Sequence, residues 1–187
     1  ALRLFQGFEQ LSNEIGGYSK GVKGHVRLWA NMSALTEFLP SALASFLKTY
    51  PEIQLEVEEQ LSGDIVRALM DGIADIGVFA EGPVTSGLET KMIGRDQLVI
   101  ACSKDHLLSK RKSITFEECL KYDFVGLNRG SSLLELTSRS AEKLGKTMRL
   151  KIQVRSYDAM CQMIAVNLGI GVLPFQACGA QIKAMNL

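Results

Sequence analysis

The chain has 187 residues, of which 47% are hydrophobic and 22% are charged, and its formal net charge is +1. This ordinary globular composition has room for one generous domain or two small ones. A nearly neutral chain lacks the basic face of nucleic-acid-binding domains, so we expect these residues not to bind DNA themselves. No apolar run approaches the ~18 residues of a membrane span, and the N-terminal stretch ALRLFQGFEQLSNEI has no signal-peptide core.

The residue types that catalysis or metal binding would need are sparse. The two histidines are far apart in sequence, and the chain has no GxSxG motif and no CxxC pair. We therefore predict that the chain is not an enzyme and holds neither a metal nor a cofactor. The widely spaced cysteines favour reduced thiols in a cytoplasmic protein. These are Cys102, Cys119, Cys161 and Cys178.

The first 15 residues have the apolar spacing of a helix. Leu4, Phe8, Leu11 and Ile15 are separated by four, three and four positions. This helix either packs on the domain or serves as a linker that faces a partner. The glycine-rich residues 16–24 then form a loop and a candidate hinge.

The stretch from Gly24 to Glu59 predicts a strand, a tight turn, a helix and a second strand. His25–Ala30 is the first strand, and Ser33 is the expected N-cap of the helix. Pro40 is discordant with a regular helix, which ends at Tyr50-Pro51. Apolar and polar residues then alternate from Ile53 onward. Such a βαβ unit is right-handed and belongs to a mostly parallel sheet.

The pattern continues as helix and strand. Ser62 is the expected N-cap of a helix that Gly72 ends, and Ala74–Phe79 is the next strand. Leu88–Ile93 and Gln97–Ser103 are two further strand candidates.

The second half repeats this alternation. Phe124–Leu127 and Leu150–Val154 are predicted strands, and either Ser131 or Ser132 caps the helix between them. Ser156 opens the helix that follows the second of these strands.

The order of these motifs resembles the effector-binding domain of LysR-type transcriptional regulators. The resemblance rests on a glycine-led strand at Gly24, the helix ending FLKTYP and the series Ser62, Leu69, Gly72 and Asp75. The turn KDHLL at 104–108 resembles the family's "HPL" turn, with Leu107 where proline is common. MCQMIAVNLGIGVLP at 160–174 resembles its "V..G.GI..LP" signature. The match runs from about Gly24 to Pro174, most of the chain.

The resemblance implies an α/β fold like that of type 2 periplasmic binding proteins, with two Rossmann-like subdomains, a hinge and two crossover strands. It also implies a DNA-binding helix-turn-helix before the first helix and a final strand and helix after Leu187. The implied division is a linker helix and hinge loop at 1–23, a first subdomain at 24–100 and 175–187, and a second subdomain at 101–174.

In such a fold, three turns that begin helices with hydroxyl or amide residues would face one cleft. Helix N-termini suit a carboxylate or another anion, and Arg129 could add a charge-assisted bond. Each serine could instead be only a cap, Arg129 a surface residue, and each phenylalanine part of the core. The predicted effector-binding residues are Asn31, Met32, Ser33, Ser62, Phe79, Asn128, Arg129, Gly130 and Phe175.

The resemblance thus predicts a sensor of a small polar or anionic metabolite. Its partners would be a second copy in a homodimer or tetramer, with the helix Ala34–Thr49 as one half of the contact, and DNA through a domain absent from this chain. No membrane partner is expected. Two alternatives stay open: a periplasmic solute-binding protein of a transporter, and a fragment of a cytosolic enzyme of similar fold.

Overall fold

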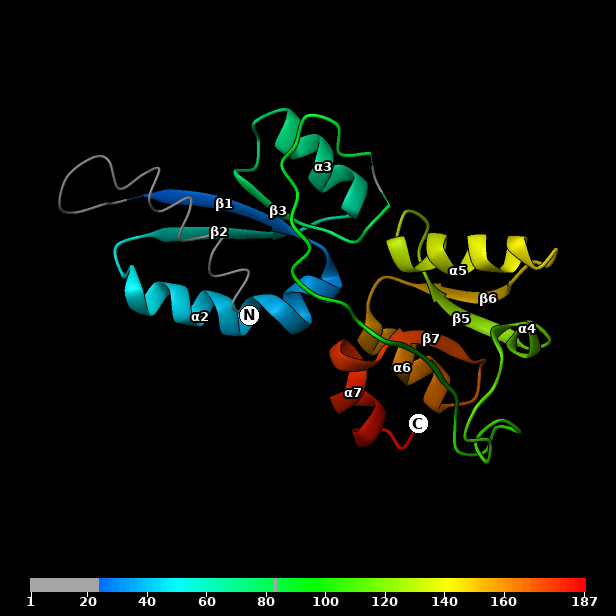
Figure 1. Ribbon diagram of the computed structural model, residues 1–187. Helices are drawn as coiled ribbons and strands as arrows, with labels where there is room; N and C mark the ends of the chain where they lie inside the picture. The colour runs from blue at the N-terminus through cyan, green and yellow to red at the C-terminus, as the bar shows by residue number, and fades with distance from the viewer. Residues whose placement is uncertain (1–23, 83) are drawn as a thin grey trace. The chain divides into compact units, whose positions relative to one another are not determined.

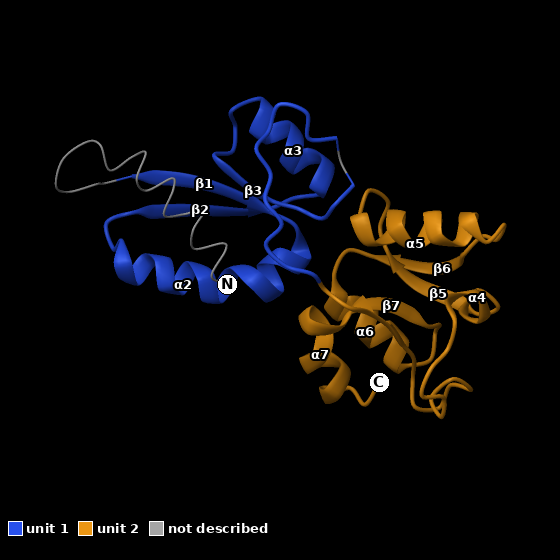
Figure 2. Ribbon diagram, in the orientation of Figure 1, with its two compact units in different colours: residues 1–95 blue, residues 96–187 orange. Residues whose placement is uncertain are grey.

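The computed structural model describes residues 24–82 and 84–187, which belong to two compact units, residues 1–95 and 96–187 (Figure 2). The predicted helix and loop before residue 24 lie outside the described residues. The second unit includes residues 175–187, which the predicted division assigns to the first subdomain. The division into subdomains stays a prediction.

The first unit is built on a three-stranded parallel sheet in the order β2-β1-β3 (Figure 1). Its strands are β1 (His25–Ala30), β2 (Gln54–Glu59) and β3 (Ile76–Val78). Leu28, in the centre of β1, pairs with Val57 and with Ile76. The predicted β-α-β-α-β order is confirmed.

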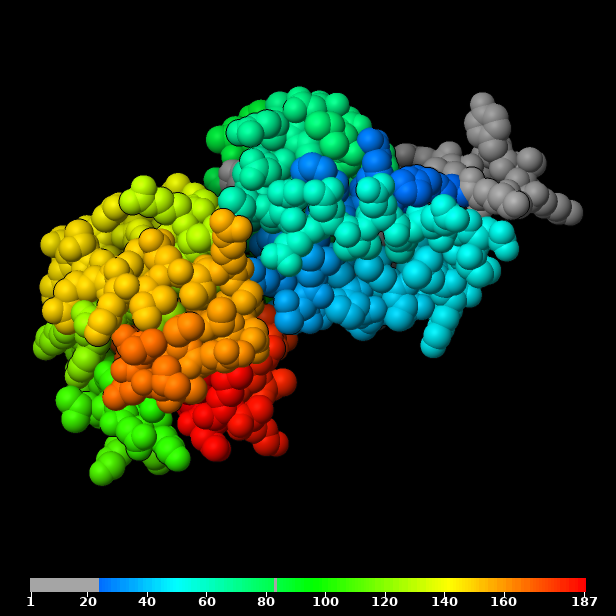
Figure 3. All heavy atoms as spheres, turned by 180° about the vertical axis from the view of Figure 1, so that it is seen from behind, coloured from blue at the N-terminus to red at the C-terminus, as the bar shows by residue number. Residues whose placement is uncertain are grey.

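Two helical segments cover opposite faces of this sheet. On one face, Leu39 and Phe46 are buried against Leu28 in the core of the unit. They lie on α2 (Leu39–Thr49), which with the chain leading to β2 forms the light-blue to cyan surface in Figure 3. On the other face, α3 (Ser62–Met70) lies so close to β3 that a Cβ atom on Gly77 would come within 2.6 Å of Leu69 Cδ1. This helix ends as predicted, with Gly72 at a φ of +68°.

The turn before α2 explains how the helix accommodates its proline. Residues Ala34–Phe38 (η1) form a π-helical turn in which the Leu39 N–H donates to the Ala34 carbonyl, five residues back. Pro40 has no N–H, and its ring would collide with the Thr36 carbonyl in a regular α-helix. The wider turn relieves that collision, so the helix continues through Pro40.

The strand predicted at Leu88–Ile93 is wrong, because these residues form no strand in the described chain. The segment is a connection that runs over the first unit: Ile93 packs against its core and Gly94 lies against the Phe38 ring. A Cβ on Gly94 would come within 2.7 Å of Phe38 Cε1. Ile93 therefore packs on the first unit without strand pairing, whereas Met92 is exposed (57%).

The second unit contains two strand pairs. β4 (Leu98–Ala101) pairs antiparallel with β7 (Gly171–Pro174), and β5 (Asp123–Leu127) pairs parallel with β6 (Arg149–Val154). An isolated parallel bridge between Phe124 and Ile170 joins the pairs. The helices are α4 (Phe116–Cys119), α5 (Ser132–Lys143), α6 (Tyr157–Ala165) and α7 (Phe175–Ala184).

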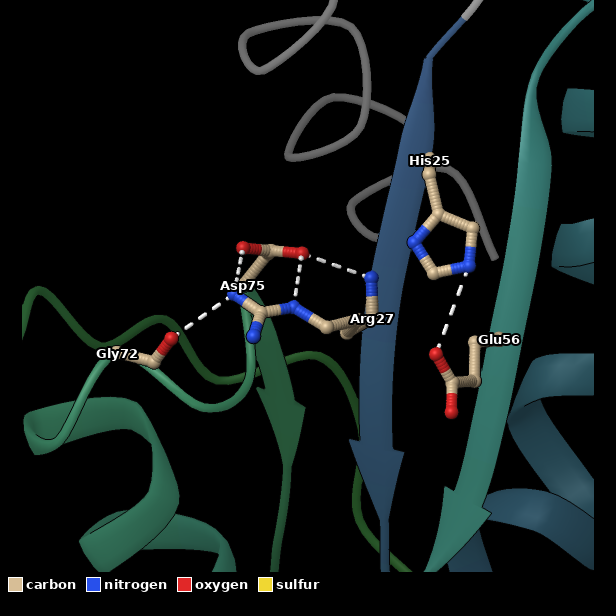
Figure 4. A network of polar contacts seen from close by, with 5 residues as sticks. All are labelled: His25, Arg27, Glu56, Gly72 and Asp75. Carbon is tan, nitrogen blue, oxygen red and sulfur yellow. Dashed lines mark hydrogen bonds and ion pairs between the residues drawn. The ribbon is translucent and has the colours of Figure 1, made fainter.

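A polar network joins the starts of the strands in the first unit (Figure 4). The Arg27 guanidinium donates to both carboxylate oxygens of Asp75, at 3.2 Å from Nε and 2.9 Å from Nη2, and to the Gly72 carbonyl at 2.8 Å. The Arg27 backbone N–H also donates to Asp75, at 2.8 Å. His25 Nε2 lies 3.5 Å from a carboxylate oxygen of Glu56 on the neighbouring strand. The network fixes the chain between α3 and β3 against β1.

Asp75→Asn tests this network through pH. The side-chain hydrogen bonds from Arg27 lower the pKa of the Asp75 carboxyl. The charged pair therefore stabilises the fold above the unfolded carboxyl's pKa of about 3.9, and its contribution is lost as pH falls through the lower folded value. Urea unfolding should show Asp75→Asn less stable than wild type at pH 7, with the difference shrinking below about pH 4. Asp71→Asn, at an exposed position, is the control, and a difference independent of pH would contradict the role of the pair.

Candidate functional site

In the first unit, parallel pairing brings the carboxyl ends of three strands to one edge of the sheet. The Asn31 N–H donates to the Val78 carbonyl at 2.9 Å, and the Gln60 N–H donates to the Ala30 carbonyl at 3.0 Å. The predicted site residues Asn31, Met32, Ser33, Ser62 and Phe79 all follow these strand ends. The structure therefore gathers them at one edge, which we call edge 1. Ligands of open α/β sheets bind at such edges.

The helix after β1 is capped by Asn31, so the prediction that Ser33 is the N-cap is wrong. Asn31 Oδ1 accepts from the Ala34 N–H at 3.0 Å, whereas Ser33 already has helical backbone angles and no side-chain cap bond. An amide side chain caps as well as a hydroxyl does, and Asn31 comes first after the strand. Met32 and Ser33 are half-buried in the first turn.

Ser62 is not the N-cap of α3 either, because that position belongs to Leu61. The Ser62 hydroxyl is buried and accepts from the Ala80 N–H at 3.2 Å. Its bond therefore ties the start of α3 to the chain that leaves β3. Phe79, next to Ala80, is half-buried.

The second unit has an edge of the same kind, which we call edge 2. β5 ends at Leu127 and β6 at Val154, and the Asn128 N–H donates to the Val154 carbonyl at 2.9 Å. Gly130 adopts a φ of +88°, which favours glycine, in the turn that leads to α5. Ser131 settles the choice between the two candidate caps, since its hydroxyl accepts from the Leu134 N–H at 3.2 Å.

Arg129 and Phe175 are exposed. Arg129, in the turn of edge 2, makes no ion pair within the described residues. Phe175 begins α7, and half of its surface is exposed (50%), so it does not belong to the core. Its N–H donates to the Gln97 carbonyl at 2.8 Å, and it follows the carboxyl end of β7, which runs parallel to β5 at the Phe124–Ile170 bridge.

Two polar residues at edge 2 are absent from the predicted set. Gln153 Nε2 donates to the Leu127 carbonyl at 3.2 Å, and the Ser156 hydroxyl caps α6 by accepting from the Ala159 N–H at 3.2 Å. Ser156 follows a strand and opens a helix, which is the same signal that selected Asn128. That signal alone could have placed Ser156 in the set.

Metal binding and thiol chemistry depend on the His, Cys, Asp and Glu side chains of the described residues. No group of three or more His, Cys, Asp or Glu side chains within residues 24–82 and 84–187 could hold a metal ion. Burial raises the pKa of Cys102, and it raises that of Cys119 to about 11, so both thiols are protonated at neutral pH. In the same part of the chain, no helix has the length and apolarity needed to cross a membrane.

Comparison with models of protein families shows to which family the chain belongs. The model of the LysR substrate binding domain matches residues 19–187. The chain belongs to this family. The resemblance of the sequence motifs is thereby confirmed.

The curated relatives of this LysR-family chain are transcriptional regulators. It is 25% identical over 175 residues to the uncharacterized HTH-type transcriptional regulator YbhD of Escherichia coli, covering 93% of this chain and 55% of that protein. It is 27% identical over 170 residues to the HTH-type transcriptional regulator CysL of Bacillus subtilis, covering 89% and 56%. The chain thus spans about half the length of these relatives.

Solved structures show the same fold. The effector-binding domain of QuiR in complex with shikimate matches with a TM-score of 0.77 at 18% identity, covering 85% of this chain and 77% of that one. The CcmR regulatory domain of Synechocystis PCC6803 in complex with 2-PG matches with a TM-score of 0.75 at 22% identity, covering 83% and 74%. The predicted α/β fold of the periplasmic-binding-protein type is confirmed.

Removing the cap at edge 2 should destabilise the second unit. Ser131→Ala leaves the Leu134 N–H without its acceptor, and we expect unfolding free energy to fall by about 1 kcal/mol. Ser138→Ala, in the middle of α5, is the matched control and should cost clearly less. Chemical denaturation of both variants measures this, and equal losses would contradict the assignment of the cap.

Proposed function

We propose that the chain is the effector-sensing part of a LysR-type transcriptional regulator, and that a small molecule bound at edges 1 and 2 controls transcription. The observation that carries this proposal is the gathering of polar helix-opening residues at the carboxyl ends of parallel strands in both units. Family membership and the descriptions of the relatives support it over a solute-binding protein or an enzyme. The proposal places the protein in the cytoplasm.

The proposed ligand is a small polar molecule, with an anion favoured. Backbone N–H groups of the first helical turns and the positive ends of helix dipoles point toward such edges. Arg129 has a guanidinium that no described carboxylate neutralises, so it can form a charge-assisted bond to a ligand. Shikimate, the ligand named for the QuiR domain, is itself a carboxylate.

The proposed mechanism is a shift between two arrangements of a first subdomain (24–100 and 175–187) and a second (101–174). A ligand shifts that balance only through its different affinities for the two arrangements. A linker helix within residues 1–23 would pass the change to a DNA-binding domain elsewhere in the full protein. DNA binding, in this proposal, is not a task of the residues described above.

Asn128→Ala is the sharpest test of the ligand site. The Asn128 side chain has no described hydrogen bond to lose, so the melting temperature of the free protein should stay nearly unchanged. Thermal-shift screening of small carboxylates and phosphate esters, including shikimate and 2-PG, should yield a stabilising ligand, since a ligand at 100 times its Kd adds about 2.7 kcal/mol. Calorimetry should then show about tenfold weaker binding to Asn128→Ala.

The matched control is Gln162→Ala, which removes an exposed amide from α6 outside the proposed site. Its affinity should equal that of wild type. Equal affinity in Asn128→Ala would remove that residue from the site. Ser33→Ala tests edge 1 in the same assay, with weaker binding expected.

We also propose a homodimer in which each copy sets its acidic unit against the basic unit of the other. Residues 24–95 hold ten carboxylates against five lysines and arginines, a formal charge of −5. Residues 96–187 hold thirteen lysines and arginines against eight carboxylates, a formal charge of +5. Complementary charges steer association and set its orientation. The helical segment Ala34–Thr49 remains the proposed contact on the acidic unit.

Salt dependence tests this pairing. Sedimentation velocity in 50 mM and 500 mM NaCl should show a dimer whose Kd rises by about tenfold or more at the higher salt, because exposed charges are then screened. A dimer of unchanged affinity would show that apolar contacts, not the opposite charges, hold the copies together.

A further inference from the structure

A cavity of about 250 Å³ opens at the amino ends of β5 and β6, the reverse end of these strands from edge 2. Its lining includes His106, Asp123, Arg149, Lys151 and Asn167. Asp123 begins β5, and the strand carries the chain about 13 Å to Leu127 at edge 2. The cavity is therefore separate from the residues proposed to bind the effector.

One carboxylate in this cavity is shared by two cations. Arg149 Nε lies 3.4 Å from Asp123 Oδ1, and Lys151 Nζ lies 3.5 Å from Asp123 Oδ2. Both separations are too long for the short charge-assisted bonds of about 2.8 Å that strong pairs make. One positive charge is left uncompensated, and the Lys151 ammonium keeps donors available for a further acceptor.

The backbone pairing of β5 with β6 fixes the positions of the two cations. Arg149 pairs in register with Asp123, and its guanidinium also donates to the Lys121 carbonyl, which orients it. A β-bulge follows, because Phe124 pairs with Leu150 and the next pair is Val125 with Ile152. Lys151 is thus the extra residue of the bulge. Bulges re-aim side chains and are frequent beside functional sites.

The other walls of the cavity add fixed hydrogen-bond donors. His106 Nδ1 accepts from the Leu108 N–H at 3.2 Å, so the neutral ring carries its proton on Nε2. Burial lowers the pKa of His106, which favours that neutral form, and the ring packs edge-on against Tyr122. Asn167 adds an amide from a left-handed turn with φ of 60°. Among the lining side chains, donors thus outnumber acceptors.

We propose that this cavity binds a small oxyanion, a carboxylate or a phosphate, between Arg149 and Lys151. Its volume lies below the roughly 300–1,000 Å³ of pockets for drug-sized ligands, which fits a small ion better than a large metabolite. The anion competes with Asp123 for the two cations. The bound anion also links the starts of β5 and β6 to the turn at Asn167–Gly169 that leads into β7. The second unit then has a ligand-binding site separate from edge 2. This proposal stands independently of the function proposed above.

NMR titration of the chain with inorganic phosphate, and separately with acetate, tests the site at an ionic strength held constant with NaCl. Saturable amide shifts are expected at Lys151, Asn167 and Gly169. Lys151→Gln should weaken binding about fivefold. Asp123→Asn should strengthen it a few-fold, because the competing carboxylate is gone. Lys146→Gln is the matched control, since that lysine pairs with Glu117 outside the cavity and its loss should change nothing.

Three results would overturn the proposal: shifts that do not saturate, shifts that NaCl alone reproduces, or equal binding by wild type and Lys151→Gln. An unchanged melting temperature of Lys151→Gln shows that its fold is intact. Whichever of phosphate and acetate binds more tightly identifies the class of anion.

Discussion

The parallel pairing of β1 with both of its neighbours is the constraint on which the first unit depends. It brings the ends of β1, β2 and β3 together, so that three turns far apart in the sequence meet at edge 1. The same constraint operates between β5 and β6 at edge 2. A parallel sheet usually returns its chain through helices, so the ends of β1, β2, β5 and β6 are also approaches to helix starts. The topology alone therefore gathers polar backbone groups of strand ends and helix starts at these edges, whether or not a ligand is bound.

The sequence predicted the regular elements well, because their signals are local. β1 occupies the predicted residues, and the alternation in β2 and β6 and the glycine that ends α3 mark their elements clearly. Predictions failed where the deciding contact is distant or ambiguous. The Ser62 hydroxyl bonds an N–H that lies 18 residues further along the chain. Asn31 and Ser33 are equally good caps in isolation, and only the position of the strand end selects Asn31. Leu88–Ile93 has the apolar residues of a strand, but no strand pairs with it in the described chain, and Ile93 packs on the core of the first unit.

The predicted site residues fall into two groups, according to whether their side chains already make hydrogen bonds to the backbone. Asn31 and Ser62 hold helix starts in place through bonds to backbone N–H groups, so they shape edge 1. The side chains of Asn128 and Arg129 make no such bonds within the described residues, so they are available to a ligand. A capped and hydrogen-bonded frame that supports a few free polar groups is pre-organised for binding, since little entropy is lost when the ligand arrives.

We infer above all that the helix-opening residues at the strand ends bind the effector. The most direct test is an NMR titration of the chain with a ligand from the thermal-shift screen. We expect saturable amide shifts at residues 31–33 of edge 1 and at residues 128–130 of edge 2. Binding of the ligand that leaves the amides of both edges unshifted would contradict this inference.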